Sequence, residues 1–190
     1  MANWLIAGLG NPGPQYEHTR HNVGFWWLDQ LARDLSTTFS VENKFHGQLA
    51  QAQLSEHKLF LLKPLVFMNR SGQSVAALAN FYKIPLSNTL VIHDELDLPT
   101  GVARLKRGGG HGGHNGLRDI IAKTGSKDFL RCRLGINHPG DSRQVADYVL
   151  SKPSQSDRQL ILSAIDDSLR VLPDILSDDL DKAMNWLHSQ

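Results

Sequence analysis

The fold is decided by residues 4–24, which read WLIAGLGNPGPQYEHTRHNVG. The apolar run at residues 5–9 predicts a short buried strand, and the glycines and prolines after it mark a tight loop. From residue 22 to Leu35 the apolar side chains recur at helical spacing, which predicts an amphipathic helix. A strand, a glycine-rich loop ending at His21 and a helix, in this order, are typical of an α/β fold.

The same alternation continues toward the C-terminus. Further strands are expected at residues 48–54, 58–62, 90–94, 102–106 and 129–136. Further helices are expected at residues 71–82, 115–123, 154–172 and 179–188. The polar residues 55–57 predict a hairpin, Ser71 is expected to cap its helix, and Pro173 to follow the helix before it. We therefore expect a single domain over residues 1–190, a three-layer α/β/α sandwich with a twisted mixed central sheet.

Composition limits the class of protein. The 190 residues carry a formal net charge of +1 and one cysteine, Cys132, whose apolar surroundings predict a core position. One cysteine is compatible with a reducing cytosol, no apolar run approaches the roughly 20 residues of a membrane span, and the first residues do not resemble a secretory signal. Basic clusters at residues 104–107 and 131–133 could still bind the phosphates of a nucleic acid.

Two titratable residues follow predicted strands. His21 ends the first loop, and Asp94 ends the strand at residues 90–94. A histidine, with a pKa of about 6.5, can accept a proton from water near neutral pH, and a carboxylate bonded to its other ring nitrogen fixes the tautomer. A surface histidine and a capping aspartate would give the same spacing, so from these residues alone both interpretations stay open.

Amides and glycines occupy the remaining loops. Asn69 and Asn115 stand where helices begin, so they could position a water or simply cap the helices. Residues 108–116 hold six glycines, which allow close backbone approach, but no Walker A motif closes them. The G-x-G-x-x-G match at residues 8–13 is weak evidence for a dinucleotide site, because Pro12 lacks an amide donor.

Other side chains suggest ligands. His111 and His114 could bind a metal together with Asp94, although no cysteine or tight metal motif supports this. Tyr16 and Phe67 could stack on a nucleic-acid base, although core packing would also explain Phe67. A set of basic residues could bind phosphate or be a solvated surface: Arg104, Lys106 and Arg133.

Taken together, these stretches resemble bacterial peptidyl-tRNA hydrolases. The resemblance runs from residue 5 to about residue 149, and the helices after it fit more loosely. Its motifs, in the family's order, are residues 8–13, 19–24, 67–69 with 71–72, 93–97, and 108–116. The chain departs from the family at Val66, where threonine is frequent, and at residues 137–138, where glycine and arginine are more usual.

The resemblance implies a cytoplasmic monomer with an α/β/α domain and no cofactor, metal or stable protein partner. It implies hydrolysis of the ester that joins a peptide to the 3′-terminal ribose of tRNA, with contacts to the acceptor stem and 3′ end. By position, His21 would be the catalytic base, Asp94 would keep it basic, and Asn11 would separate N-blocked peptidyl-tRNA from free aminoacyl-tRNA.

The resemblance also implies roles for further residues. Contacts to tRNA and substrate would come from Tyr16, Phe67, Asn69 and Asn115. The cleft wall would be formed by Met68 and His114, and the tRNA phosphates would be clamped by Lys106 and Arg133. Two rival functions are a non-catalytic tRNA- or RNA-binding module and a metal hydrolase using His111, His114 and Asp94.

Overall fold

The computed structural model describes residues 2–190, and its strands form one seven-stranded sheet in the order β2-β3-β4-β1-β5-β7-β6. The strands are β1 (Asn3–Gly8), β2 (Ser40–Glu42), β3 (Gly47–Leu54), β4 (His57–Pro64), β5 (Thr89–Glu95), β6 (Ala103–Arg107) and β7 (Leu130–Gly135). β1, β4, β5 and β7 pair in parallel, whereas β2, β3 and β6 join the sheet by antiparallel pairing. The mixed sheet and the β3–β4 hairpin expected from the sequence are therefore confirmed.

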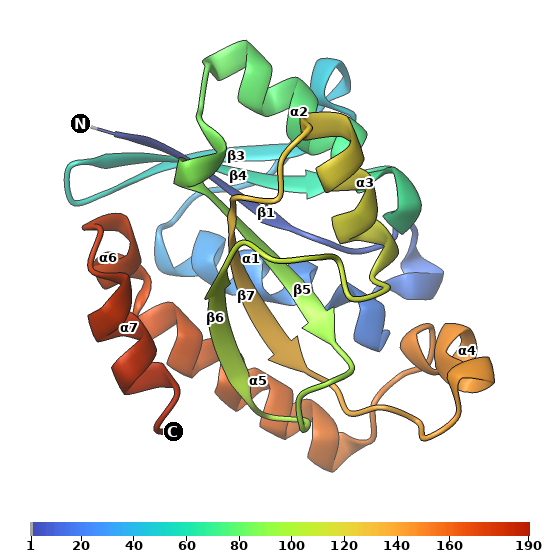
Figure 1. The fold of residues 1–190 in the computed structure, drawn as a ribbon. Helices are drawn as coiled ribbons and strands as arrows, with labels where there is room; N and C mark the ends of the chain where they lie inside the picture. Colours follow the sequence, from blue (N-terminus) through green and yellow to red (C-terminus); the bar gives the residue numbers. More distant parts are fainter. Residues whose placement is uncertain (1) are drawn as a thin grey trace.

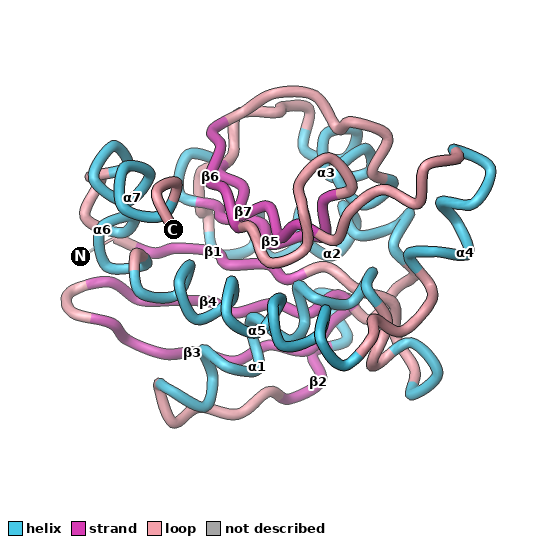
Figure 2. The backbone as a smooth tube through the Cα atoms, turned by 90° about the horizontal axis from the view of Figure 1, so that it is seen from below, coloured by secondary structure: helices cyan, strands magenta, loops and turns pink. Residues whose placement is uncertain are grey.

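Helices cover both faces of this sheet (Figures 1 and 2). They are α1 (Val23–Asp34), α2 (Ser71–Tyr82), α3 (Asn115–Thr124), α4 (Val145–Val149), α5 (Gln155–Arg170), α6 (Leu172–Leu176) and α7 (Leu180–Leu187). One apolar core joins the sheet to α1, α5, α6 and α7, and a second joins its other face to α2 and α3. The α/β/α sandwich is confirmed, and no helix within residues 2–190 is long and apolar enough to cross a membrane.

Several local expectations were wrong. The helix expected at residues 154–172 ends at Arg170, and Pro173 lies in the first turn of α6, where a missing N–H costs nothing. Leu160, expected on the buried stripe, is 49% exposed. Ser71 is the first residue of α2 rather than its N-cap, and its hydroxyl donates to the Met68 carbonyl.

The sheet topology predicts a ligand-binding crevice beside β1. β1 lies between β4 and β5, and the chain leaves β1 toward α1 but leaves β4 toward α2, on the opposite face. Open α/β sheets bind ligands where successive connections diverge in this way, outside the carboxyl ends of the strands. The loops that follow β1, β4 and β5 therefore meet at one edge of the sheet.

Close packing of α1 brings the first loop to this edge. A Cβ atom at Gly24 would lie 2.5 Å from the Leu9 nitrogen and 2.6 Å from the Ile92 oxygen, so the first turn of α1 rests directly on the ends of β1 and β5. Any side chain at residue 24 would force α1 away from the sheet. Glycine at this position therefore places His21, three residues earlier, beside the end of β5.

Candidate active site

A carboxylate lies between two histidines at this edge of the sheet. Asp94, near the end of β5, is buried. One of its oxygens lies 2.9 Å from Nδ1 of His21, and the other lies 2.8 Å from Nε2 of His114. The sequence predicted the pairing of His21 with Asp94, and the structure brings His114 to the same carboxylate.

The backbone of α3 determines the proton positions in this triad. Nδ1 of His114 caps α3 by accepting hydrogen bonds from the amides of Gly116 and Leu117, at 3.1 and 3.3 Å. Nδ1 must therefore be unprotonated, and Nε2 carries the proton that is donated to Asp94. Asp94 likewise accepts the Nδ1 proton of His21, which leaves Nε2 of His21 with a free lone pair.

Burial and charge act in opposite directions on the pKa values of this group. Burial by itself would raise the pKa of Asp94, but the charges and hydrogen bonds of His21 and His114 outweigh it and hold that pKa well below its ordinary range. Burial would likewise lower the pKa of His21, but the charge of Asp94 and its hydrogen bond raise it above the ordinary value. The pair is thus a stable carboxylate beside an imidazole that binds a proton readily.

The same three side chains gather the kinds of ligand atom that metals use. One ligand atom each from His21, Asp94 and His114 lie within 4.8 Å of one another. However, a metal at Nε2 of His114 would require the proton to move to Nδ1, which faces the amide hydrogens of α3. The donor set therefore fits a hydrogen-bonded triad better than a metal centre. His111, expected in the metal alternative, bonds the Gly113 amide instead.

Asn11 presents an oriented amide in the loop that leads to His21. It is buried, and its Oδ1 accepts a 2.7 Å hydrogen bond from the amide of Met68, which follows β4. Its Nδ2 makes no hydrogen bond within residues 2–190. The side chain therefore offers a hydrogen-bond donor, and the Met68 bond fixes which way the amide faces.

The other residues predicted to contact substrate lie in the loops after β1 and β4 or at the start of α3. Phe67 is 57% exposed and meets Tyr16 edge to face, so its interpretation as a core residue was wrong. Asn69 and Asn115 are exposed. Neither is a helix cap, because Arg70 and His114 occupy those positions, so the capping interpretation was wrong for both amides. The exposed Phe67 and Asn69 are thus accessible to a ligand, whereas Oδ1 of Asn115 already accepts a hydrogen bond from Arg118.

Basic residues line a second hollow beneath the glycine-rich loop. A pocket of about 310 Å³ is lined by both predicted phosphate residues, Lys106 and Arg133, and by buried His93. Arg131 was expected in a surface cluster, but it is almost fully buried and its guanidinium donates to the carbonyls of Gly109 and Gly110. The sequence missed this role because alternation along β7 does not show what covers each face.

Comparison with known proteins decides the family. A sequence model described as peptidyl-tRNA hydrolase matches residues 5–190. The chain belongs to the peptidyl-tRNA hydrolase family. Peptidyl-tRNA hydrolases of Coxiella burnetii and Neisseria meningitidis are 57% and 54% identical, with 97% and 98% of this chain and 97% of each relative covered.

Solved structures agree with this assignment. The crystal structure of peptidyl-tRNA hydrolase from Acinetobacter baumannii is 45% identical and has a TM-score of 0.94, covering 97% of this chain and 93% of the other. The resemblance inferred from the motifs is therefore confirmed, and it extends through the C-terminal helices.

The sequence did not indicate a role for Asn22, which lies between His21 and α1 and bonds the backbone of Asn11.

Proposed function

We propose that this chain hydrolyses the ester of peptidyl-tRNA by activating water at Nε2 of His21. Membership of the family identifies the chain as an ester hydrolase acting on peptidyl-tRNA. The observation that supports His21 as the base is its 2.9 Å hydrogen bond to buried Asp94, which directs the free lone pair away from the carboxylate. An imidazole held in this tautomer can accept a proton from water.

The proposed reaction needs no covalent intermediate on the protein. Nε2 of His21 takes a proton from water, and the hydroxide attacks the ester carbonyl. Asp94 stabilises the imidazolium, and Asn69 or Asn115 holds the water or donates to the oxyanion of the tetrahedral intermediate. The C–O bond to the ribose then breaks, and the imidazolium returns its proton to the ribose oxygen. The products are a peptide with a free carboxylate and a tRNA with a free terminal hydroxyl.

Asn11 is proposed to select the blocked substrate. An N-acylated residue carries an amide carbonyl, which accepts hydrogen bonds, whereas a free aminoacyl ester carries an ammonium group, which only donates. Because Oδ1 of Asn11 is occupied by the Met68 amide, the side chain presents Nδ2 as a donor. The Nδ2 donor therefore stabilises binding of the acyl carbonyl, whereas it can form no hydrogen bond with an ammonium group.

Outside the reaction centre, the remaining residues are proposed to bind tRNA. Lys106 and Arg133 are proposed to hold a backbone phosphate at the acceptor stem, with Tyr16 and Phe67 stacking on bases of the 3′ end. Met68 and His114 would form the cleft wall. The chain is further proposed to act in the cytoplasm as a monomeric single domain. Size-exclusion chromatography of the purified protein would test the monomeric state.

The test replaces His21 and measures cleavage and binding separately. His21→Ala should lose most turnover of an N-acetylaminoacyl-tRNA while binding tRNA normally. His18→Ala, a change of the same residue type at an exposed position of the same loop, is the matched control. Near-normal turnover of His21→Ala would refute the assignment. In excess chelator, loss of cleavage by the unmodified protein would favour a metal hydrolase, and no cleavage with or without chelator would favour the binding module.

A further inference from the structure

We propose that Asn22 is a positioning residue that sets the preference for N-blocked substrates by fixing the backbone of Asn11. The inference rests on the selector role proposed above for Asn11. Asn22 lies at the start of α1, directly after His21, and its side chain is almost fully buried. Its two side-chain hydrogen bonds go to the backbone of Asn11, so its effect on selection is expected to pass through Asn11.

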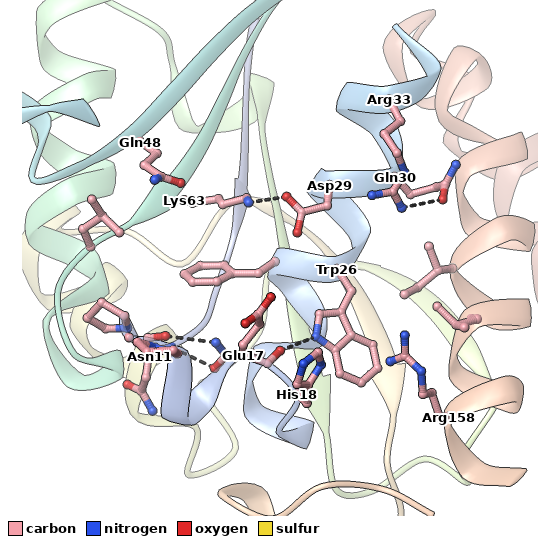
Figure 3. A pocket seen from close by; sticks show the side chains of 18 of the residues that line it. Asn11, Glu17, His18, Trp26, Asp29, Gln30, Arg33, Gln48, Lys63 and Arg158 are labelled. Atoms are coloured by element: carbon pink, nitrogen blue, oxygen red, sulfur yellow. Dashed lines mark hydrogen bonds and ion pairs between the residues drawn. The ribbon is translucent and has the colours of Figure 1, made fainter. Parts of the chain in front are cut away.

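The contact between the two residues is a two-point clamp. Oδ1 of Asn22 accepts from the Asn11 amide and Nδ2 of Asn22 donates to the Asn11 carbonyl, each at 2.9 Å. Figure 3 shows both bonds at Asn11, at the edge of a pocket of about 580 Å³ that lies behind the loop. Every polar backbone atom of Asn11 is thereby held by one side chain.

The neighbouring sequence is shaped to admit this clamp. A Cβ atom at Gly10 would lie 2.9 Å from Cγ of Asn22, so a larger residue at position 10 would push the amide out. On the other side, residues 12–14 are Pro-Gly-Pro, and Gly13 has a φ of 110° that favours glycine. The loop has no regular secondary structure at Asn11, so the clamp supplies the hydrogen bonds that a sheet would otherwise provide.

Two separate contacts then fix the orientation of the Asn11 side-chain amide. Asn22 fixes the backbone of Asn11, and the Met68 amide fixes its side chain. If the backbone could rotate, the bond to Met68 would break and the amide could turn over. A turned amide presents Oδ1, which accepts hydrogen bonds from an ammonium group. Loss of the clamp should therefore weaken discrimination more than it weakens catalysis at His21.

The experiment compares one aminoacyl-tRNA with and without an N-acetyl group, and reports the ratio of the two kcat/KM values. Asn22→Ser removes both clamp bonds without adding charge, and Asn22→Asp keeps the volume but places an oxygen against the Asn11 carbonyl. Each should lower the ratio about tenfold or more, the discrimination expected from one well-placed hydrogen bond. Ser74→Ala, which removes a buried hydroxyl bond to the Phe45 carbonyl and no bond to Asn11, should leave the ratio unchanged.

Two further variants separate this inference from the selector role. Asn11→Ala should lower the ratio, and adding Asn22→Ser to it should lower the ratio no further. If Asn11→Ala leaves the ratio unchanged, the selector role fails and the inference with it. If Asn11→Ala lowers the ratio but folded Asn22→Ser and Asn22→Asp do not, the selector role survives and the clamp inference alone is overturned. Equal losses on both substrates in the Asn22 variants would overturn it as well, because they would indicate an effect on His21.

Discussion

Replacing Asp94 by asparagine tests the proposed base at the atom that determines its tautomer. In the native protein both carboxylate oxygens accept hydrogen bonds, one from Nδ1 of His21 and one from Nε2 of His114. Asparagine has the same shape but only one oxygen and an NH₂ group. One of the two histidines must therefore face a donor, and that histidine must change its tautomer or lose the bond.

The structure indicates which histidine changes. His114 cannot move its proton to Nδ1, because that atom accepts hydrogen bonds from the amides that begin α3. The asparagine oxygen should therefore turn to His114, and its NH₂ group should face His21. Nδ1 of His21 must then become the acceptor, and Nε2, the proposed base, carries the proton.

The expected cost in kcat is large. A histidine held in the wrong tautomer by the same substitution in a protease triad loses about 10⁴-fold in kcat, so we expect Asp94→Asn to lose about 10³- to 10⁴-fold. This corresponds to about 4–5.5 kcal/mol of activation free energy. The residual activity should also shift with pH. Burial continues to lower the pKa of His21 once the charge of Asp94 is gone, so the acid limb of the profile should move to lower pH.

A second substitution tests the tautomer argument itself. His114→Asn keeps an N-cap for α3 but removes the histidine that holds the asparagine oxygen. In the double variant, the amide at position 94 can turn its oxygen back to His21. We therefore expect the double variant to be about tenfold more active than Asp94→Asn, after correction for the effect of His114→Asn alone.

The assay is the initial rate of N-acetylaminoacyl-tRNA cleavage between pH 5 and 9 at saturating substrate, with tRNA binding measured separately. Two results would refute the reasoning. The first is an Asp94→Asn variant within tenfold of the native kcat. The second is a double variant no more active than the single one, which would show that His114 does not direct the tautomer.

Three other predictions concern binding and stability. Lys106→Ala should weaken tRNA binding and reduce the slope of log K against log salt by about 1, whereas Lys58→Ala should not; an unchanged slope would argue against a phosphate contact. His93→Gln should reduce the acid sensitivity of folding, because burial, aided by nearby His114, lowers the pKa of His93 to about 3. The unfolded state therefore binds more protons below pH 6.5, and native stability should fall by up to about 1.4 kcal/mol per pH unit toward pH 3. Urea unfolding at pH 7 and pH 5 measures this, and an identical pH dependence in native protein and variant would contradict it. Gly24→Ala should destabilise the protein by about 2–3 kcal/mol despite the better helix propensity of alanine, because its Cβ meets the Leu9 and Ile92 backbone; unchanged urea stability would show that α1 can shift.

The sequence predicted much of the fold because its elements are strongly patterned. The helix at residues 71–82 was predicted at its observed bounds, and the hairpin of β3 and β4 follows from alternation broken by a polar turn. Short elements were missed, since the three residues of β2 and the five of α4 are too few to show a period. Leu160 was wrongly placed on the buried face of α5, because helical periodicity does not show how much of the helix surface the sheet covers.

For the site, residue types and loop positions sufficed to propose His21 and Asp94 as a base and its partner, because the carboxyl ends of parallel strands meet at one edge of a sheet. The family resemblance added the role of Asn11. Beyond the pairing of His21 with Asp94, neither the sequence nor the resemblance revealed what the polar atoms of these residues bond, because those partners come from segments far apart in the chain. Asp94 meets a histidine 20 residues away, and Asn11 meets the backbone of Met68, 57 residues away.

The sequence by itself thus determined the α/β layering, through its apolar periods, and which side chains with useful chemistry follow the strands. Only the tertiary structure decided the proton positions and the orientations of these side chains. Capping of α3 by His114 sets the protons of the triad, and the clamp of Asn22 sets the direction in which Asn11 donates. The physical reason is that a hydrogen bond depends on distance and angle between particular atoms, whereas sequence patterns report only which face of an element a residue occupies.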